Sequence, residues 1–240
     1  QISSAGMEML KDELLAALEK VCKPKTILFK YNGKMRAPEE LESYVKVGFG
    51  EEIEDAPLEE NGVKFIAPVV TGQKTGWFYD HRMNRARLKD YVKGKKVLDL
   101  YSYVGGWGIQ AAAFGAESVT CVDSSSLALS YVAKNAVLNN VEDKVTSIEG
   151  DVIEVCRQLI EEGEKFDVVI VDPPAFIPRR KDQKVGERAY QKLNQLAMRL
   201  LNRDGLLVSA SCSMHLSRPA LVTALRLSGQ TLEKRLQIIE

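Results

Sequence analysis

The stretch "KKVLDLYSYVGGWG" (residues 95–108) predicts the fold of the larger part of the chain. Its apolar, β-branched run ends at Asp99 and Leu100, as expected of a buried strand with a polar residue near its end. The glycine pair Gly105-Gly106 follows, and a helical segment is expected over 107–114, closed by Gly115. Strand, glycine turn and helix in this order predict the first unit of a layered α/β sheet.

The same alternation repeats down the chain. Four more strand-like runs are "SVTCVD" (118–123), "KVTSIEGD" (144–151), "FDVVIVD" (166–172) and "DGLLVSASC" (204–212). Helical segments are expected over 125–139, 152–162 and 187–202, with apolar faces at Leu127, Tyr131 and Leu138 in the first and at Tyr190, Leu193, Ala197 and Leu200 in the last. This pattern predicts a Rossmann-like, doubly wound and mostly parallel sheet with helices on both faces.

Residues 1–72 predict a small α+β domain ahead of that sheet. Apolar residues recur at helical spacing from Ser3 or Ser4 to Pro24, and strands are expected at "TILFK" (26–30), "YVKVGFG" (44–50) and "NGVKFIAPVVTG" (61–72). The expected organisation is therefore a central α+β domain over 1–72 and a catalytic domain over 73–240.

Composition excludes some functions. The 33 Lys and Arg balance the 33 Asp and Glu, so the chain has no net positive charge to attract nucleic acid. Neutrality does not exclude a local basic patch. The sequence has neither a membrane-length apolar stretch nor a signal peptide, which favours the cytoplasm. The cysteines are scattered and only two histidines occur, so no metal site is expected. Cys121 and Cys156 lie in apolar patterns and are expected in the core.

Ligands of such sheets bind at the carboxyl ends of the strands. Asp123 ends the second strand at about the 20-residue distance from the glycines at which an acidic residue meets a ribose diol. Asp151 ends the third strand beside the same crevice, and Asp99 was expected to line it. The turn lacks G-x-G-x-x-G, which argues against a dinucleotide. Acidic strand ends and a diglycine turn instead suit a nucleoside without phosphate, such as S-adenosylmethionine (SAM).

The fourth strand ends in "DPP" (172–174), a rigid corner because proline restricts its own backbone and that of the preceding residue. It resembles the [DN]-P-P-[YF] loop with which many methyltransferases grip a planar amino-bearing group. Ala175 replaces the aromatic residue and Phe176 follows one position late, which weakens a nitrogen-methylating interpretation. A plain strand-to-loop turn is the alternative.

Five segments together resemble one family. They are "TGQKTGWFYDHRMNR" (71–85), "LDLYSYVGGWG" (98–108), "VDSS" (122–125), "FDVVIVDPPAF" (166–176) and "SCS" (211–213). Across nearly the whole chain the sequence resembles the ribosomal RNA large-subunit methyltransferase I family. The resemblance implies a class I methyltransferase that transfers methyl from SAM to carbon 5 of a cytosine in 23S ribosomal RNA.

The resemblance also implies residue roles. Asp123 would bind the ribose and Asp151 the adenine of the cofactor, and Cys212 would be the nucleophile with Asp172 facing the base. The implied cofactor-binding residues are Thr75, Asp80, Arg82, Arg85, Ser102, Gly105, Asp123, Ser124 and Asp151. The implied substrate-binding residues are Pro173, Pro174, Phe176, Arg179 and Arg180.

Cys212 and the basic loop "IPRRKDQKVGER" (177–188) carry the substrate side of this hypothesis. A thiolate that adds to carbon 6 of cytosine makes carbon 5 nucleophilic, which is covalent catalysis. The alternative for Cys212 is a buried small hydrophobe, which its flanking serines and strand-end position disfavour. The loop would contact phosphates next to a base in a single strand or loop, unless it is only a solvated face.

Two departures from the family predict that the sequence is part of a longer protein. Family members begin with an RNA-binding module of the pseudouridine-synthase and archaeosine-transglycosylase type. A final antiparallel hairpin is also expected, of which "KRLQIIE" is predicted to be the penultimate strand, without its partner strand. Two other functions stay open: methylation of a guanine or adenine nitrogen, and a non-catalytic RNA-binding assembly factor. Apolar surface on the small domain could support a homodimer.

Overall fold

The computed structural model describes residues 1–239, which form two compact units. One comprises Gln1–Leu58 and Ile66–Tyr79, and the other comprises Glu59–Phe65 and the chain from Asp80 onward. The second unit contains the predicted sheet. No helix among the described residues is both long and apolar enough to cross a membrane.

The first unit is built on an antiparallel pair of strands. Its elements are α1 (Ala5–Met9), α2 (Lys11–Cys22), β1 (Thr26–Tyr31), a 3₁₀ helix (Ala37–Glu39) and β2 (Tyr44–Gly50). Tyr31 of β1 pairs with Tyr44 of β2, and the buried Arg36 guanidinium stacks on both rings. The one predicted helix is two, because the chain turns at Leu10 between α1 and α2. Both strands lie where the sequence predicts them.

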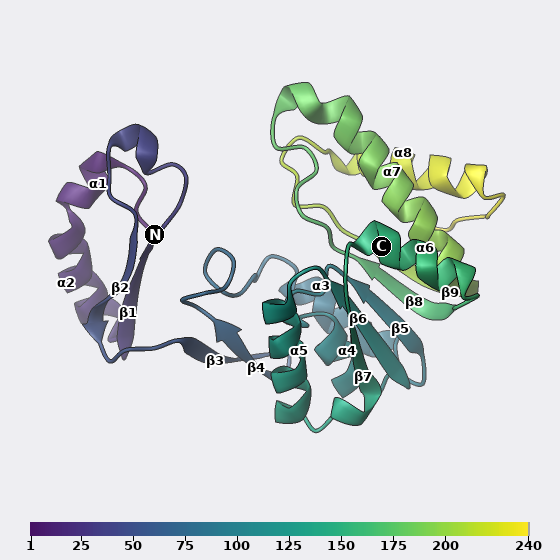
Figure 1. Cartoon of the computed structure of the whole chain (residues 1–240), viewed down its shortest axis with the longest axis horizontal. Coiled ribbons are helices and arrows are strands. Elements are labelled where there is room, and N and C mark those ends of the chain that lie inside the picture. The colour runs from purple at the N-terminus through teal and green to yellow at the C-terminus, as the bar shows by residue number, and fades with distance from the viewer. Residues whose placement is uncertain (240) are drawn as a thin grey trace. The chain divides into compact units, whose positions relative to one another are not determined.

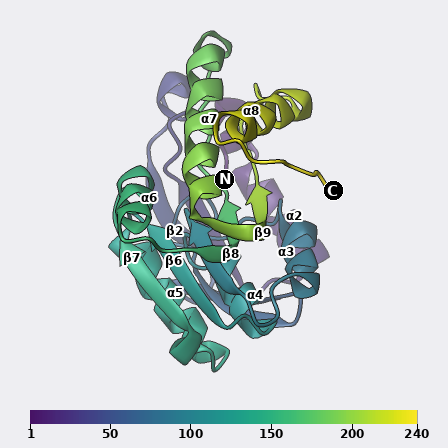
Figure 2. The same ribbon diagram turned by 90° about the vertical axis from the view of Figure 1, so that its right-hand side faces the viewer.

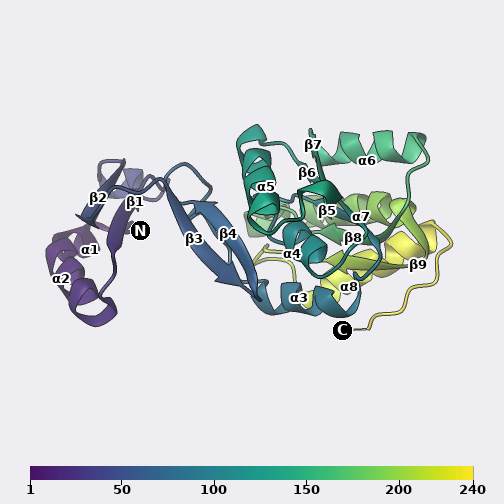
Figure 3. The same cartoon turned by 90° about the horizontal axis from the view of Figure 1, so that it is seen from below.

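A hairpin has its outer ends in the first unit and its turn region, Glu59–Phe65, in the second. Its strands are β3 (Asp55–Glu60) and β4 (Val63–Pro68), which pair with each other and are seen lengthwise in Figure 3. Asn61 and Gly62 form the connection with positive φ angles of 56° and 80°, the backbone that a tight two-residue hairpin requires. The sequence predicts β4 but not β3, whose acidic run "DAPLEE" has no strand pattern.

The second unit contains a five-stranded parallel sheet in the order β7-β6-β5-β8-β9 (Figure 1). Its strands are β5 (Lys96–Leu100), β6 (Ser118–Asp123), β7 (Val145–Glu149), β8 (Phe166–Val171) and β9 (Leu201–Ser209). Its helices are α3 (Arg82–Arg87), α4 (Gly108–Ala113), α5 (Ser126–Leu138), α6 (Val152–Glu161), α7 (Gln183–Leu200) and α8 (Arg218–Thr231). Short 3₁₀ helices cover Leu88–Asp90, Glu142–Lys144 and Arg180–Asp182. The predicted doubly wound, Rossmann-like fold is confirmed.

Helices cover both faces of this sheet, as Figure 2 shows. Residues that alternate along the strands, such as Leu98, Leu100 and Val169, pack with α6 and α7 in one buried cluster. The intervening residues face α4, so that the α4 residue Gly108 lies against Cys121 and Val119. Near-continuous apolar strands are the consequence of this two-sided burial.

Gly108 is a point of close approach between α4 and the sheet. A methyl group on its Cα would lie 2.6 Å from the Cys121 sulfur and 3.0 Å from Asp99 Oδ2. Its backbone N–H donates to the same carboxylate oxygen at 2.8 Å. The absence of a side chain therefore lets the first turn of α4 sit directly over Asp99.

We expect Gly108→Ala to lower the free energy of unfolding by about 1–3 kcal/mol, because the added methyl group overpacks the contact between α4 and the sheet. Urea denaturation followed by circular dichroism measures this change. Gly6→Ala is the matched control, since no atom lies within 4 Å of the position of its added methyl. Equal stability of the two variants would contradict the close approach.

Candidate functional site

The turn after β5 has a strained backbone. Tyr101, Tyr103 and Gly105 all have positive φ, of 64°, 50° and 85°. Non-glycine residues rarely adopt this conformation, and they cluster at functional sites when they do. The Ser102 N–H donates to Val122 O at 3.0 Å, and the Gly105 N–H donates to Ser102 O at 2.8 Å. These bonds fix the turn against the end of β6.

Asp99 lies beneath this turn and not in an open crevice, so the expectation that it lines the ligand site is wrong. The residue is fully buried, and its Oδ2 accepts the Gly108 N–H. Burial, with a smaller contribution from the nearby charges of Asp172 and Asp123, raises the pKa of Asp99 to about 8 despite the lowering effect of the Gly108 hydrogen bond. Asp99 therefore holds the start of α4.

Asp123 and Asp151 lie at neighbouring strand ends, as predicted. The half-buried Asp123 accepts the N–H of Tyr103 on Oδ2 at 2.9 Å and the N–H of Ser125 on Oδ1 at 3.0 Å. The Gly150 N–H donates to Asp123 O at 3.1 Å, which joins the end of β7 to that of β6. Asp151 is exposed and caps α6 through Oδ1. The structure brings these two carboxylates and the turn to one edge.

Asp172, one residue past β8, accepts a hydrogen bond from one side chain and lies near another, and neither of the two was predicted from the sequence. Trp107 donates its indole N–H to Asp172 Oδ2 at 2.9 Å, and His81 Nε2 lies 3.7 Å from Asp172 Oδ1. The buried Trp107 follows the diglycine turn, where an indole N–H needs an acceptor. That requirement was the signal available in the sequence.

Arg85 makes a buried ion pair with Glu60. Its Nε and Nη2 donate to the two Glu60 oxygens at 2.6 Å and 2.9 Å, and Gln110 also donates to Glu60 Oε1 at 2.9 Å. The guanidinium lies 5.9 Å from the Trp107 ring centre. The resemblance implies a cofactor contact for Arg85, and in the structure the buried guanidinium contacts Glu60 and lies near the Trp107 ring.

Cys212 is exposed and lies three residues beyond the end of β9. Its sulfur donates to Pro173 O at 3.7 Å, so the "SCS" segment meets the "DPP" segment as expected from the neighbouring positions of β8 and β9. The alternative of a buried structural thiol is wrong for Cys212. Cys121 and Cys156 are that kind of thiol: both are fully buried, and burial raises their pKa values.

The remaining predicted residues lie mainly on the surface. Thr75 belongs to the first unit, where its hydroxyl donates to Trp77 O at 3.2 Å. Phe176 is half-buried, and Arg179 forms an exposed ion pair with Asp182 at 2.9 Å. The other predicted residues that are exposed are Asp80, Arg82, Ser124, Pro174 and Arg180.

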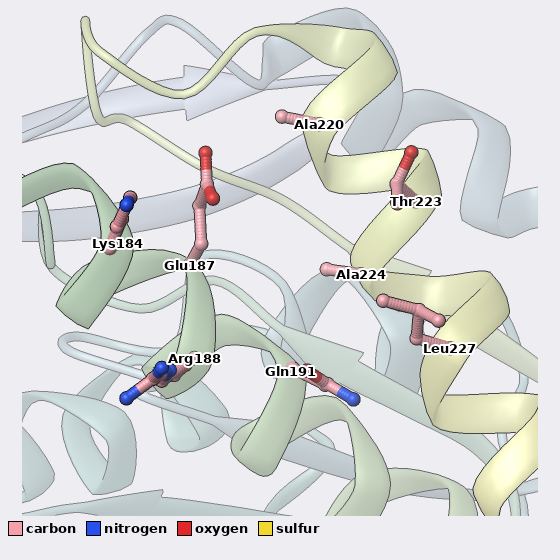
Figure 4. Close-up of a pocket in the computed structure, with 8 residues that line it drawn as sticks. All are labelled: Lys184, Glu187, Arg188, Gln191, Ala220, Thr223, Ala224 and Leu227. Carbon is pink, nitrogen blue, oxygen red and sulfur yellow. The ribbon is translucent and has the colours of Figure 1, made fainter.

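A separate hollow of about 420 Å³ lies between α7 and α8 (Figure 4). Lys184 and Arg188, from the predicted basic loop, are among its lining residues on α7. The opposite wall is Ala220, Thr223, Ala224 and Leu227 of α8. The structure thus places part of the basic segment on a helical groove.

A parallel sheet with acidic side chains and a glycine turn at its carboxyl edge defines the fold class of the Rossmann-like methyltransferases. A family model described as S-adenosylmethionine-dependent methyltransferase matches residues 34–226. The chain belongs to this family.

Similar proteins agree with that membership. A ribosomal RNA large subunit methyltransferase I from Aliivibrio fischeri is 40% identical over 89% of this chain and 54% of its own length. The chain thus spans about half the length of the curated relatives it matches. A solved SAM-dependent methyltransferase from Agrobacterium tumefaciens superposes with a TM-score of 0.70 at 23% identity, over 88% of this chain and 67% of its own. A candidate SAM-dependent methyltransferase from Streptococcus mutans superposes with a TM-score of 0.79 at 22% identity, over 94% of this chain and 57% of its own.

The residues at the carboxyl edge fit this family's cofactor. Ser102 Oγ is buried, interacts with the Cys121 thiol and makes no hydrogen bond to an oxygen or nitrogen atom among the described residues, so the turn has polar capacity to spare. Each Asp123 oxygen uses one lone pair on a backbone N–H and can accept a ribose hydroxyl with the other. The carboxylates of Asp123 and Asp172 also suit a cationic ligand.

The buried Asp99 predicts a pH-dependent stability. Its pKa is raised from 3.8 to about 8 by folding, so the folded protein binds a proton that the unfolded chain has released. The stabilising effect is present below pH 4 and is lost as pH rises through about 8.

Asp99→Asn removes this titration. We expect wild type to lose about 2–4 kcal/mol of unfolding free energy relative to the variant between pH 5 and pH 8. Urea denaturation of both proteins across this range measures the difference. A constant difference at every pH would contradict the raised pKa of Asp99.

Proposed function

We propose that this protein methylates carbon 5 of a cytosine in 23S ribosomal RNA, with Cys212 as covalent nucleophile and SAM as methyl donor. The observation that carries the proposal is the position of the exposed Cys212 thiol against the Pro173 carbonyl, beside the fixed carboxylate of Asp172. The names of the relatives, which are ribosomal RNA large subunit methyltransferases I, support the same substrate.

The turn after β5 and the ends of β6 and β7 would hold the cofactor. Ser102 and Gly105 would face its methionine part, Asp123 the ribose, and Asp151 the adenine. Bound SAM supplies an electrophilic methyl group on a cationic sulfur. Position 105 requires glycine, because its φ of 85° disfavours other residues and a side chain there would clash with Ile109 Cγ1 at 2.7 Å.

Cys212 would activate the target base. Its thiolate adds to carbon 6 of cytosine, forming a C–S bond and making carbon 5 electron-rich enough to take the methyl group. Loss of the carbon-5 proton to a base and expulsion of the thiolate then restore the aromatic ring. Only an accessible thiol can do this, which Cys212 is and the buried Cys121 and Cys156 are not.

Asp172 would orient the cytosine. Its carboxylate is half-buried, and the Trp107 N–H occupies only one lone pair of Oδ2. The other lone pairs can accept the amine of the base and a proton-bearing N3 as the adduct forms. The Trp107 hydrogen bond limits the rotation of the carboxylate, which favours a single orientation of the base.

RNA would reach this edge as a single strand or loop, since a base in a duplex is inaccessible to Cys212. The exposed Arg179 and Arg180 follow the "DPP" segment closely enough to contact flanking phosphates. Lys184 and Arg188 extend this basic segment along α7. We further propose homodimerisation through α1 and α2, which bury no residue and expose Met9 and Val21.

We expect the protein to bind SAM, and Asp123→Asn to weaken that binding about 10- to 100-fold through loss of a charge-assisted hydrogen bond. Isothermal titration calorimetry measures both affinities. Asp143→Asn is the control, because the exposed Asp143 precedes β7 at the other end of the strand. Absence of SAM binding by the parent protein would favour the non-catalytic alternative.

We expect Cys212→Ala to abolish methyl incorporation into protein-free 23S ribosomal RNA, while Cys22→Ala, an exposed cysteine in α2, stays active. RNA containing 5-fluorocytosine should form a covalent adduct with wild type. Release of the enzyme requires removal of a proton from carbon 5, and fluorine takes the place of that proton. Gel electrophoresis under denaturing conditions detects the adduct. Wild-type activity of Cys212→Ala would refute the covalent mechanism.

A further inference from the structure

A buried tyrosine of α7 forms hydrogen bonds with both serines of the "SCS" segment. Tyr190 is fully buried, and its hydroxyl accepts a hydrogen bond from Ser211 Oγ at 2.8 Å and lies 2.9 Å from Ser213 Oγ. The Ser213 N–H donates to Ser211 Oγ at 3.2 Å, which closes a polar ring under Cys212. Both serines therefore turn inward, and the residue between them turns outward.

The same tyrosine also fastens the "DPP" segment. Its ring packs on Phe176 with centroids 4.9 Å apart, and the Ile177 N–H donates to Ser213 Oγ at 3.2 Å. Gly186, one turn before Tyr190 on α7, admits this approach, because a methyl group there would lie 2.3 Å from Ile177 Cγ1 and 2.8 Å from Phe176 O. α7 is therefore pressed against the loop that carries Asp172 and Pro173.

We infer that Tyr190 is a positioning residue for Cys212: its hydroxyl joins the loops after β8 and β9 and fixes the thiol relative to Asp172. This inference rests on the proposed function of Cys212. Tyr190 touches no reacting atom. It acts by holding two serines, and its buried hydroxyl is costly to leave unpaired, which resists displacement of either loop.

Tyr190→Phe tests this role, since it keeps the ring against Phe176 and removes only the hydroxyl. We expect kcat to fall about 10- to 100-fold, as small displacements of reacting groups do, while the KM for RNA and the Kd for SAM stay within about twofold. Adduct formation with 5-fluorocytosine RNA should slow by the same factor. Tyr131→Phe is the control, a buried tyrosine of α5 on the opposite face of the sheet.

The outcomes separate the two proposals. If Cys212→Ala is inactive and Tyr190→Phe turns over like Tyr131→Phe, the positioning role is refuted and the covalent mechanism stands. If Cys212→Ala is active, the covalent mechanism fails and the positioning role falls with it. Should Tyr190→Phe not fold, Ser213→Ala removes the same hydrogen bond from the other side, and unchanged adduct formation by it would refute the role.

Discussion

The parallel pairing of β8 with both β5 and β9 is the constraint on which the rest of the site depends. Parallel strands end at the same edge, so the turn after β5, Asp172 after β8 and the segment after β9 emerge together. Both side chains therefore lie close to the ends of their strands: Asp172 is one residue beyond β8, and Cys212 is three residues beyond β9. Apolar burial on both faces holds the strands in register, and the distances between the residues that follow the strand ends depend on this register.

The electrostatics of the edge follow from concentrating carboxylates on it. Burial raises the pKa of Asp99, and the charges of Asp172 and Asp123 raise it as well, so ionisation of all three carboxylates together is unfavourable. Each carboxylate receives an N–H donor, from Gly108, Tyr103 and the Trp107 indole respectively. A cationic group near these carboxylates would relieve the repulsion that remains.

Periodicity predicted the sheet well because buried parallel strands are nearly continuous apolar runs, and the inward face of α7 was confirmed at Tyr190 and Leu193. The predicted face of α5 is confirmed at Tyr131 but wrong at Leu127 and Leu138, which are exposed while small residues such as Ala128 pack inward. α8 was not predicted at all. The acidic residues at the strand ends could be predicted from the sequence. The hydrogen bonds of Asp172 with Trp107, and of Ser211 and Ser213 with Tyr190, join segments far apart in sequence, and no local pattern predicts them.

The two buried cysteines have a consequence for following how this fold comes apart. Cys121 lies in the layer between the sheet and α4, and Cys156 lies in the α6–α7 layer on the other face. Burial raises the pKa of both thiols, so each becomes reactive toward an alkylating reagent when its own layer opens. The molecule therefore carries one native chemical reporter in each helical layer, and the order of their labelling would reveal which layer separates from the sheet first.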